Sequence, residues 1–225
     1  MKTVKHLFHE YGHGLWMVTY MIFYMASFFI LENASHRHYH VIHSWIDDQI
    51  PFCEYFIIPY LAWFLYLVVG VCWFIFKAKD RTEYYQLVSV LTIGMTIFLI
   101  VSCVYPNKQD LRPEVFANNN MFTQLVKHLY ATDTPTNVLP SIHVFNSLAM
   151  FYAINGSRQL KKYRVVRIGS GILTVSIVLS TMFLKQHSVV DVSLGILMSI
   201  ALQMFCERIF QGDGAYRKER LRRSY

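Results

Sequence analysis

The sequence predicts an all-α fold: a polytopic membrane protein with six transmembrane helices in a bundle and one short interfacial helix. Three observations support this class. Apolar residues make up 54% of the 225 residues, and charged residues make up only 16%, against about a quarter in an average soluble domain. The lysines and arginines gather in short stretches between long uncharged segments, as they do at the flanks of membrane spans. A nucleic-acid binder would instead spread its basic residues over a folded face.

Six segments have the length and composition of membrane spans, and together they form one predicted domain, residues 1–225. A helix needs about 20 mostly apolar residues to cross the hydrocarbon layer. The first three predicted spans are uncharged, the fourth contains His143 and the last contains Asp191. The first is longer than the apolar region of a signal peptide, so we expect it to be retained. The predicted spans are 14–31, 55–76, 86–105, 138–154, 168–184 and 188–206.

Residues 116–130 predict a further, amphipathic helix that lies in the membrane interface. We expect it to begin near the three asparagines at 118–120 and either to shape the entry of lipid or simply to cover the bundle. The apolar residues that recur at helical spacing are Met121, Phe122, Leu125, Val126 and Leu129.

The distribution of basic residues predicts the orientation of the chain. With the N-terminus in the cytoplasm, 16 of the 21 lysines and arginines fall in cytoplasmic segments and five fall in outer segments. Because cytoplasmic loops carry the excess of Lys and Arg, we expect a multi-pass protein of the cell membrane with both termini in the cytoplasm. The polar segments 105–113, 139–143 and 185–191 then meet at the outer, extracytoplasmic mouth of the bundle.

His187 and Asp191 are four residues apart, which places them on one face of a helix, about one turn apart. A carboxylate in that position accepts the imidazole N–H and holds the ring in one tautomer, so the other nitrogen is free to act as a nucleophile or base. An ionisable pair at the end of an apolar helix indicates a functional site. The alternative is a polar pair that only fixes helix packing.

The tetrapeptide at 140–143, Pro-Ser-Ile-His, predicts the start of a helix. Proline suits a first turn because its missing N–H costs nothing there, and Ser141 can cap the helix. The free N–H groups of a first turn bind anions, and His143 would project toward such an anion. Arg112 and Lys185 lie on the same side, and a guanidinium donates two parallel hydrogen bonds to a phosphate. Together these residues predict a site for a phosphate ester.

With these residues on one side, the sequence resembles the type-2 phosphatidic-acid phosphatase superfamily, whose members share three short motifs. The motifs are a Lys and Arg-Pro element, a Pro-Ser-x-His element and a Ser-Arg-x5-His-x3-Asp element. The matching residues are Arg112 and Pro113 in the first motif, 140–143 in the second, and Ser180, His187 and Asp191 in the third. The resemblance extends over about residues 86–206.

Two positions depart from the motifs. Tyr105 stands where the first motif has its Lys, and Thr181 stands where the third has its Arg. Lys108 and Lys185 are the candidate replacements. The form of the second and third motifs resembles a branch that includes inositol-lipid and sphingolipid phosphotransferases as well as bacterial phosphatases.

The resemblance implies the role of each site residue. His187 attacks phosphorus and forms a phosphohistidine, Asp191 orients His187, and His143 protonates the leaving alkoxide and then activates water or an alcohol. It implies no metal and no cofactor. The phosphate-binding residues that it implies are Arg112, Lys185, Ser141 and Lys108.

The expected function is hydrolysis of a lipid phosphate monoester or pyrophosphate at the outer leaflet by a metal-independent enzyme. Its expected partners are the lipid substrate and the bilayer, and no nucleic acid. One rival is a lipid phosphotransferase that passes the phosphoryl group from the same histidine to an alcohol, and a second is a membrane scaffold without turnover. A third rival, a metal transporter, draws on His36, His38, His40 and His43. The sequence leaves the particular lipid and the oligomeric state open.

Overall fold

The computed structural model of the chain describes residues 11–34 and 38–223, with side chains up to residue 210. Its helices are α2 (Leu15–Glu32), α3 (Trp45–Gln49), α4 (Ile57–Phe76), α5 (Arg81–Val104), α6 (Met121–Thr132), α7 (Ile142–Gly156), α8 (Arg164–Phe183) and α9 (Val189–Arg223). Single-turn 3₁₀ helices lie at Gly12–Gly14 (η1), Glu54–Phe56 (η2) and Leu160–Lys162 (η3), and two short strands at His40–Val41 (β1) and Asn107–Lys108 (β2).

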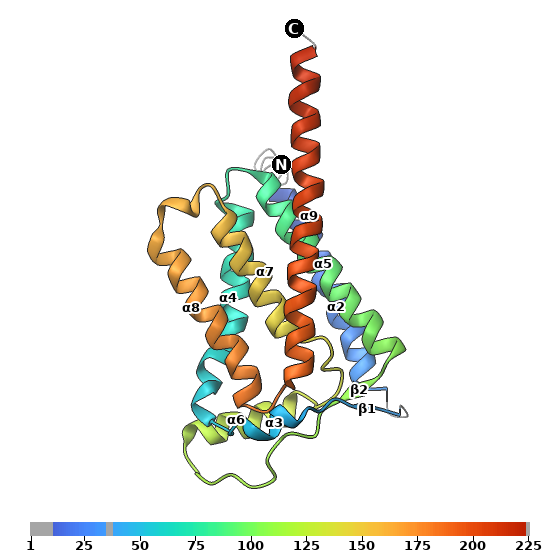
Figure 1. Cartoon of the computed structure of the whole chain (residues 1–225), viewed down its shortest axis with the longest axis vertical. Coiled ribbons are helices and arrows are strands. Elements are labelled where there is room, and N and C mark those ends of the chain that lie inside the picture. The colour runs from blue at the N-terminus through green and yellow to red at the C-terminus, as the bar shows by residue number, and fades with distance from the viewer. Residues whose placement is uncertain (1–10, 35–37, 224–225) are drawn as a thin grey trace, which may run out of the picture.

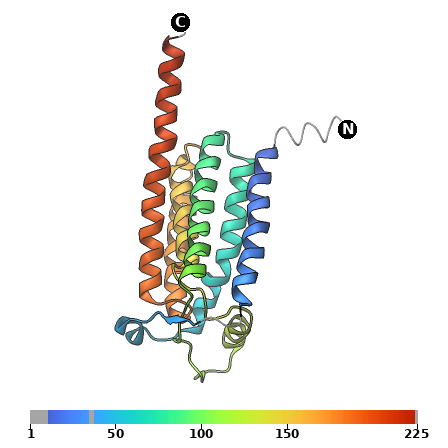
Figure 2. The same ribbon diagram turned by 90° about the vertical axis from the view of Figure 1, so that its right-hand side faces the viewer.

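The six longer helices α2, α4, α5, α7, α8 and α9 run side by side along the long axis of the molecule (Figures 1 and 2). The beginning of α2 and the end of α9 lie at one end of this bundle. The short elements α3, α6, β1 and β2 lie at the opposite end (Figure 1), which we call the loop end. The long connections after α2 and after α5 and the short turn between α8 and α9 therefore lie on one side.

Within the described residues, five helical segments are long and apolar enough to cross a membrane: Gly12–Glu32, Glu54–Phe76, Arg81–Val104, Arg164–Phe183 and Val189–Phe210. Large apolar side chains on their outer faces are exposed, Trp16, Phe29 and Leu65 among them. A soluble protein rarely exposes apolar surface on this scale. The chain is therefore an all-α membrane protein, as the composition predicts.

The predicted fourth span, 138–154, is a shorter and more buried helix than expected. Helix α7 has 15 residues and so is about 22 Å long, less than the roughly 30 Å of hydrocarbon. It begins only at Ile142 because the side-chain Oδ1 of Asn107 accepts the N–H groups of Val138 and Leu139, at 2.8 and 2.9 Å, and holds that segment as a loop. Pro140 precedes the helix rather than standing in its first turn.

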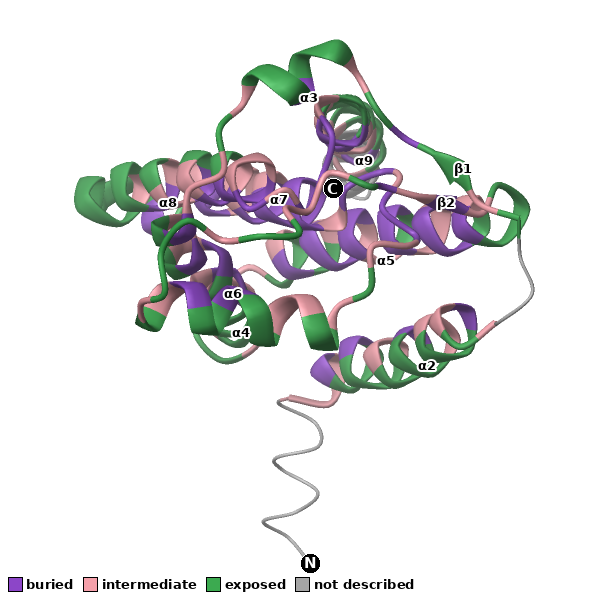
Figure 3. Cartoon of the chain, turned by 90° about the horizontal axis from the view of Figure 1, so that it is seen from below, coloured by how far each residue is buried: buried purple, intermediate pink, exposed green. Residues whose placement is uncertain are grey.

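Helix α7 occupies the centre of the bundle. It packs against α4, α5, α8 and α9, and most of its length is buried (Figure 3). Phe145 and Met150 are fully buried against Leu87, Val88 and Leu91 of α5 in the main apolar core. In a membrane, helix association rests on close packing rather than on removal of apolar surface from water, so these fully buried contacts determine the position of α7 in the bundle.

Other helix boundaries follow from caps. The side chain of Asp80 accepts the Thr82 N–H at 2.9 Å, so α5 begins at Arg81, five residues before the predicted span 86–105. Asn120 accepts the Thr123 N–H at 2.9 Å, so the predicted helix 116–130 begins at Met121. Both shifts reflect side-chain capping, which stops a helix at a defined residue.

Backbone pairing ties the loops of the loop end together. Strands β1 and β2 pair in parallel, with His40 opposite Asn107 and Val41 opposite Lys108. Lys108 also forms an isolated bridge to Thr136. The connections after α2, after α5 and before α7 therefore form one layer across the ends of the helices.

Candidate active site

His187 lies in the short turn between α8 and α9, and Asp191 lies in the first turn of α9. The Nδ1 of His187 and the Oδ2 of Asp191 are 2.5 Å apart, and Asp191 is fully buried. An ionised carboxylate only accepts hydrogen bonds, so Nδ1 carries the proton in this contact. In the neutral ring Nε2 then holds a lone pair and faces away from Asp191.

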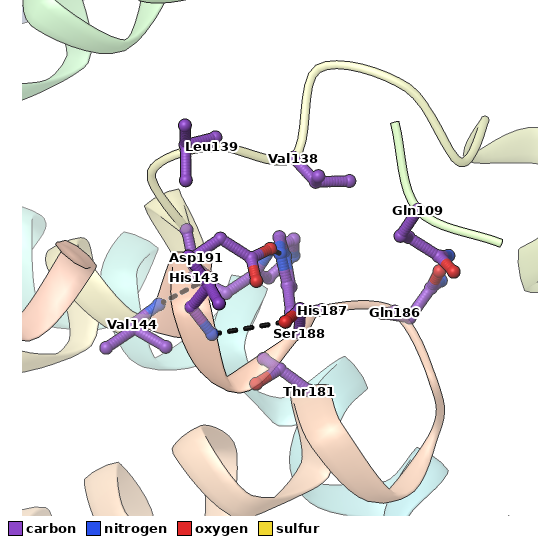
Figure 4. Close-up of polar contacts among 12 residues, drawn as sticks. Gln109, Val138, Leu139, His143, Val144, Thr181, Gln186, His187, Ser188 and Asp191 are labelled. Carbon is purple, nitrogen blue, oxygen red and sulfur yellow. Dashed lines mark hydrogen bonds and ion pairs between the residues drawn. The ribbon is translucent and has the colours of Figure 1, made fainter. Parts of the chain in front are cut away.

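His143 lies on the other side of the His187 ring (Figure 4). Its Nδ1 is 3.3 Å from the Nε2 of His187, although the two residues are separated by 44 positions. The His143 ring packs against Tyr60 and Trp63, with centroid distances of 4.7 and 4.3 Å. The described residues thus form a buried row of three groups, Asp191, His187 and His143.

The starts of α7 and α9 are held together by their backbones. The N–H of Ser141 donates to the carbonyl of Asp191 at 3.0 Å. Gly195 of α9 lies so close to α7 that a Cβ at this position would be 2.8 Å from the carbonyl oxygen of Ser141. The Ser141 Oγ caps the Val144 N–H at 3.5 Å. The Ser141 N–H thus donates and its Oγ accepts inside the protein. The phosphate contact predicted for Ser141 stays a prediction.

The first turn of α7 nevertheless offers free donors beside His143. In the described part of the chain, the N–H groups of Ile142 and His143 have no acceptor, as is usual for the first positions of a helix. Such groups bind anions. The anion site at this helix start stays a prediction, and the free donors there are the N–H groups of Ile142 and His143.

Arg112 reaches the same region from the loop after α5. Its Nη2 donates to the Gln186 Oε1 at 2.5 Å and to the Asp133 carbonyl at 2.8 Å, and its Nη1 donates to the Tyr130 carbonyl at 3.2 Å. The guanidinium also lies 4.4 Å from the centre of the Tyr130 ring. The contact with Gln186 joins Arg112 to the residue that precedes His187, but most of its donors are engaged by protein oxygens.

Two buried donors of the loop after α5 lack partners among the described residues: the Nε of Arg112 and the Nε2 of Gln109. Gln109 is only 1% exposed, and its Oε1 accepts the Leu111 N–H at 2.6 Å. A buried donor without an acceptor is costly. Neither of these two donors finds an acceptor among the described residues.

Lys185 and Lys108 are not brought to the histidines by any contact of the described residues. The Nζ of Lys185 donates to the Asp47 carbonyl at 2.6 Å, and burial lowers the pKa of this ammonium while the Asp47 and Asp48 carboxylates act in the opposite direction. Lys108 pairs through its backbone with Val41 and Thr136. The phosphate contacts of both lysines stay predictions.

Asp133, which the sequence analysis did not single out, lies at the end of α6. Its Oδ2 accepts the Tyr60 hydroxyl at 3.2 Å and the Gln186 Nε2 at 3.4 Å. Burial raises the pKa of this carboxyl, while the charges of His187 and Arg112 act in the opposite direction. The sequence feature that indicates Asp133 is its position directly after the amphipathic helix α6.

Asp47 of α3 is a second residue that was missed. Its Oδ1 accepts the Val189 N–H at 2.8 Å, and its Oδ2 accepts the Ser188 hydroxyl at 2.6 Å and the Ser44 N–H at 2.7 Å. Asp47 is 2% exposed. The spacing Ser44-x-x-Asp47 is that of a capping box, but nothing local shows that the same carboxylate also caps α9 beside His187.

The two positions that depart from the motifs have structural contacts. The Tyr105 ring stacks on His40, with centroids 4.3 Å apart. The Thr181 carbonyl accepts the N–H groups of Gln186 and His187, at 2.9 and 3.0 Å. The backbone carbonyl of Thr181 thus stabilises the turn that carries His187. Any residue at position 181 could supply the same carbonyl.

The histidines of the first outer loop do not form a metal site among the described residues. His43 contacts Asp48 at 2.9 Å, and the His38 and His40 rings are 5.7 Å apart. His36 lies outside the described residues. In the ranges 11–34 and 38–210, no three His, Cys, Asp or Glu side chains are grouped so that they could hold a metal ion.

No protein-family model, no curated protein and no solved structure matches this chain. Its class is therefore defined by its own fold and site: an all-α membrane protein with a buried Asp–His–His row at the end of the bundle where its polar loops meet.

Proposed function

We propose that the chain is a six-span membrane enzyme that hydrolyses a lipid phosphate monoester or pyrophosphate through a phosphohistidine, as the resemblance to the type-2 phosphatidic-acid phosphatase superfamily implies. The observation that supports this most strongly is the row of three groups. Asp191 fixes the proton on the Nδ1 of His187, so the lone pair of Nε2 points toward His143. A nucleophile, its orienting carboxylate and a second imidazole are the parts that histidine-based phosphoryl transfer needs.

In the first step, the Nε2 of His187 attacks phosphorus as the bond from phosphorus to the leaving oxygen breaks. His143 gives its proton to that oxygen, and Asp191 stabilises the positive charge that develops on His187. In the second step, water attacks the phosphohistidine, His143 takes a proton from the water, and the P–N bond breaks to release phosphate. When substrate binds, its phosphoryl group lies between His187 and His143, and the contact between the two rings is broken.

The phosphate oxygens need donors that hold them as charge redistributes. The N–H groups of Ile142 and His143 and the unpartnered Nε of Arg112 are the candidates for such donors. Substrate would also compete with Gln186 for the Nη2 of Arg112. Lys185 and Lys108 contribute only if their side chains turn toward the site when substrate binds.

The membrane placement belongs to the same proposal. Helix α7 completes the bundle as a sixth, short span between the five long ones, both termini face the cytoplasm, and the loop end faces the extracytoplasmic side. Helix α6 then lies at the interface beside the site, where a lipid headgroup approaches. The excess of Lys and Arg at the other end supports this orientation.

The rival transferase is favoured by one observation, the carboxylate of Asp133 beside His187. A polyhydroxy acceptor alcohol could donate a hydrogen bond to it and so be held near the phosphohistidine. One substrate labelled in its phosphate separates the two reactions. Release of inorganic phosphate supports the hydrolase, and a new labelled phosphate monoester of an added alcohol supports the transferase.

The test uses the purified protein in detergent with a panel of lipid phosphates and a chelator. We expect phosphate release from at least one lipid, and a loss of about 10³-fold or more in His187→Asn. The matched control is His128→Asn, which changes an exposed histidine of α6 and should keep full activity. Unchanged activity in His187→Asn, or turnover only with added divalent metal, would overturn the proposal.

A further inference from the structure

A cavity of about 400 Å³ opens between α7 and α8, near the connection that joins them. This connection lies at the end of the bundle opposite the loop end (Figure 1), so the cavity is separate from the histidines. It combines an apolar part with two guanidinium groups. The lining residues are Phe151, Asn155, Arg164, Arg167, Ile168 and Gly171.

Arg167 is held in a fixed direction. Its Nε donates to the Asn155 Oδ1 at 3.1 Å, and the Nδ2 of Asn155 in turn donates to the Phe151 carbonyl at 3.0 Å and to the Ser170 Oγ at 3.5 Å. The two Nη groups of Arg167 have no acceptor in the described part of the chain. The network therefore presents a positioned pair of donors, the arrangement that recognises a phosphate.

Arg164 lies one turn earlier on the same face of α8 and is exposed. Its side chain makes no hydrogen bond or ion pair with the described residues. Arg158, in the same basic segment, differs: its guanidinium lies 3.9 Å from the Asp80 carboxylate. No carboxylate lines the cavity, so the charges of Arg164 and Arg167 are not neutralised there.

Below the two arginines the same face of α8 is apolar. Ile168, Ile172 and Val175 follow Arg164 at helical spacing and are 63%, 64% and 58% exposed. A helix that is long and apolar enough to cross a membrane exposes this surface to acyl chains. The positive charge at the end of α8 matches the anionic headgroup of a phospholipid, and the apolar stripe matches its acyl chains.

We propose that this cavity binds an anionic phospholipid, with the phosphate on Arg164 and Arg167 and an acyl chain along Ile168 and Ile172. Basic pockets between membrane helices bind anionic headgroups in this way. A free phosphate ester has the same charge, but it leaves the apolar stripe unused. The inference rests on the membrane setting of α8 and is independent of the proposed catalysis.

The experiment measures lipid binding to the full-length protein in a neutral detergent by native mass spectrometry. The ligands are phosphatidylglycerol, phosphatidylcholine and glycerol phosphate. We expect wild type to bind phosphatidylglycerol more tightly than phosphatidylcholine, and to bind glycerol phosphate far more weakly. In the double variant Arg164→Gln, Arg167→Gln, the phosphatidylglycerol affinity should fall about 30-fold, since each basic residue contributes about 1 kcal/mol.

The matched control is Lys161→Gln, Lys162→Gln, which removes the same charge from two exposed neighbours outside the cavity and should change the affinity less than about twofold. Equal loss in both double variants, no loss in the arginine variant, or equal affinity for glycerol phosphate would overturn the proposal. If the arginine variant does not fold, Arg164→Gln alone, which removes no contact with the described residues, should lower the affinity about fivefold.

Discussion

At the scale of single residues, two carboxylates lie near His187 in different surroundings. Asp191 contacts the ring directly at 2.5 Å, whereas Asp133 is held by the Tyr60 hydroxyl and the Gln186 amide. Asp191 orients the imidazole. Asp133 instead adds a charge that depends on pH, and because phosphate esters are anions, an ionised Asp133 opposes their binding.

Asp133→Asn should alter the pH dependence of KM. Burial raises the pKa of Asp133 above its ordinary value, so in wild type the carboxyl becomes charged as pH rises through that raised pKa, and KM for a lipid phosphate increases. The variant stays neutral and should have a lower KM on the alkaline side of that pKa. Because the phosphate itself titrates near pH 6, the quantity to plot is the ratio of the two KM values against pH.

The same shift has a consequence for stability. A carboxyl with a raised folded pKa contributes stability that is fully present below the unfolded pKa and is lost as pH rises through the folded pKa. Wild type should therefore lose stability relative to Asp133→Asn over that pH range. Asp110→Asn changes an exposed aspartate of the neighbouring loop and serves as the control. A ratio of KM values that does not vary with pH would contradict this role for Asp133.

At the scale of elements, the short helix α3 holds the turn that carries His187. Asp47 accepts hydrogen bonds from Ser44, Ser188 and Val189, and its carbonyl accepts one from Lys185. All of these contacts except that with Ser44 join residues about 140 positions apart. A five-residue helix is not stable alone, so α3 and the start of α9 stabilise each other.

Asp47→Ala should lower the free energy of unfolding by about 2–4 kcal/mol, because it leaves buried donors unpaired and removes the cap of α9. It should also lower kcat by roughly tenfold or more through displacement of His187. Thermal melting in detergent and steady-state rates measure the two effects. The neighbouring Asp48→Asn, which breaks only the exposed contact with His43, should leave both nearly unchanged; equal effects of the two variants would contradict the assignment.

The approach of α7 to α9 depends on a residue without a side chain at Gly195. Gly195→Ala would place a Cβ 2.8 Å from the Ser141 carbonyl oxygen, so the start of α7 must move. We expect a destabilisation of about 1–3 kcal/mol and a loss of activity as His143 moves from His187.

Melting temperature and kcat measure these two effects of Gly195→Ala. The control is Gly169→Ala on α8, where a Cβ meets nothing within 4 Å and where helix propensity should give a gain of up to about 1 kcal/mol. If Gly195→Ala melts at the wild-type temperature with full activity, the two helices do not need this close approach.

At the scale of the whole molecule, the bundle has two chemically different ends. The loop end carries the Asp–His–His row, and the opposite end carries the basic connection between α7 and α8. In a membrane these ends face different compartments. The orientation decides which leaflet supplies the substrate and which supplies the lipid of the proposed cavity.

Single cysteines should report this orientation. In a background in which Cys53, Cys72, Cys103 and Cys206 are replaced by Ala, Lys127→Cys on α6 should react with a membrane-impermeant maleimide in right-side-out vesicles. Lys161→Cys should react only after the membrane is permeabilised. Both lysines are exposed, so burial does not decide the result, and the reverse pattern would place the site in the cytoplasm.

The sequence by itself determined the class of the protein and the places of its long helices. Length and apolar content are properties of a continuous segment, so five of the six predicted spans correspond to long apolar helices in the structure. The contact between His187 and Asp191 is likewise local, because the two residues are only four positions apart in the sequence. The boundaries of α5 and α6 moved because caps at Asp80 and Asn120 outweigh the apolar pattern.

Only the tertiary structure decided how distant residues meet. The 3.3 Å contact of His143 with His187, the capping of α9 by Asp47 and the place of Asp133 each join segments far apart in the chain. The late start of α7 likewise depends on the Asn107 side chain. Such contacts depend on how the loops close over the packed helices, because the relative position of two segments is a property of the whole bundle and of neither segment alone.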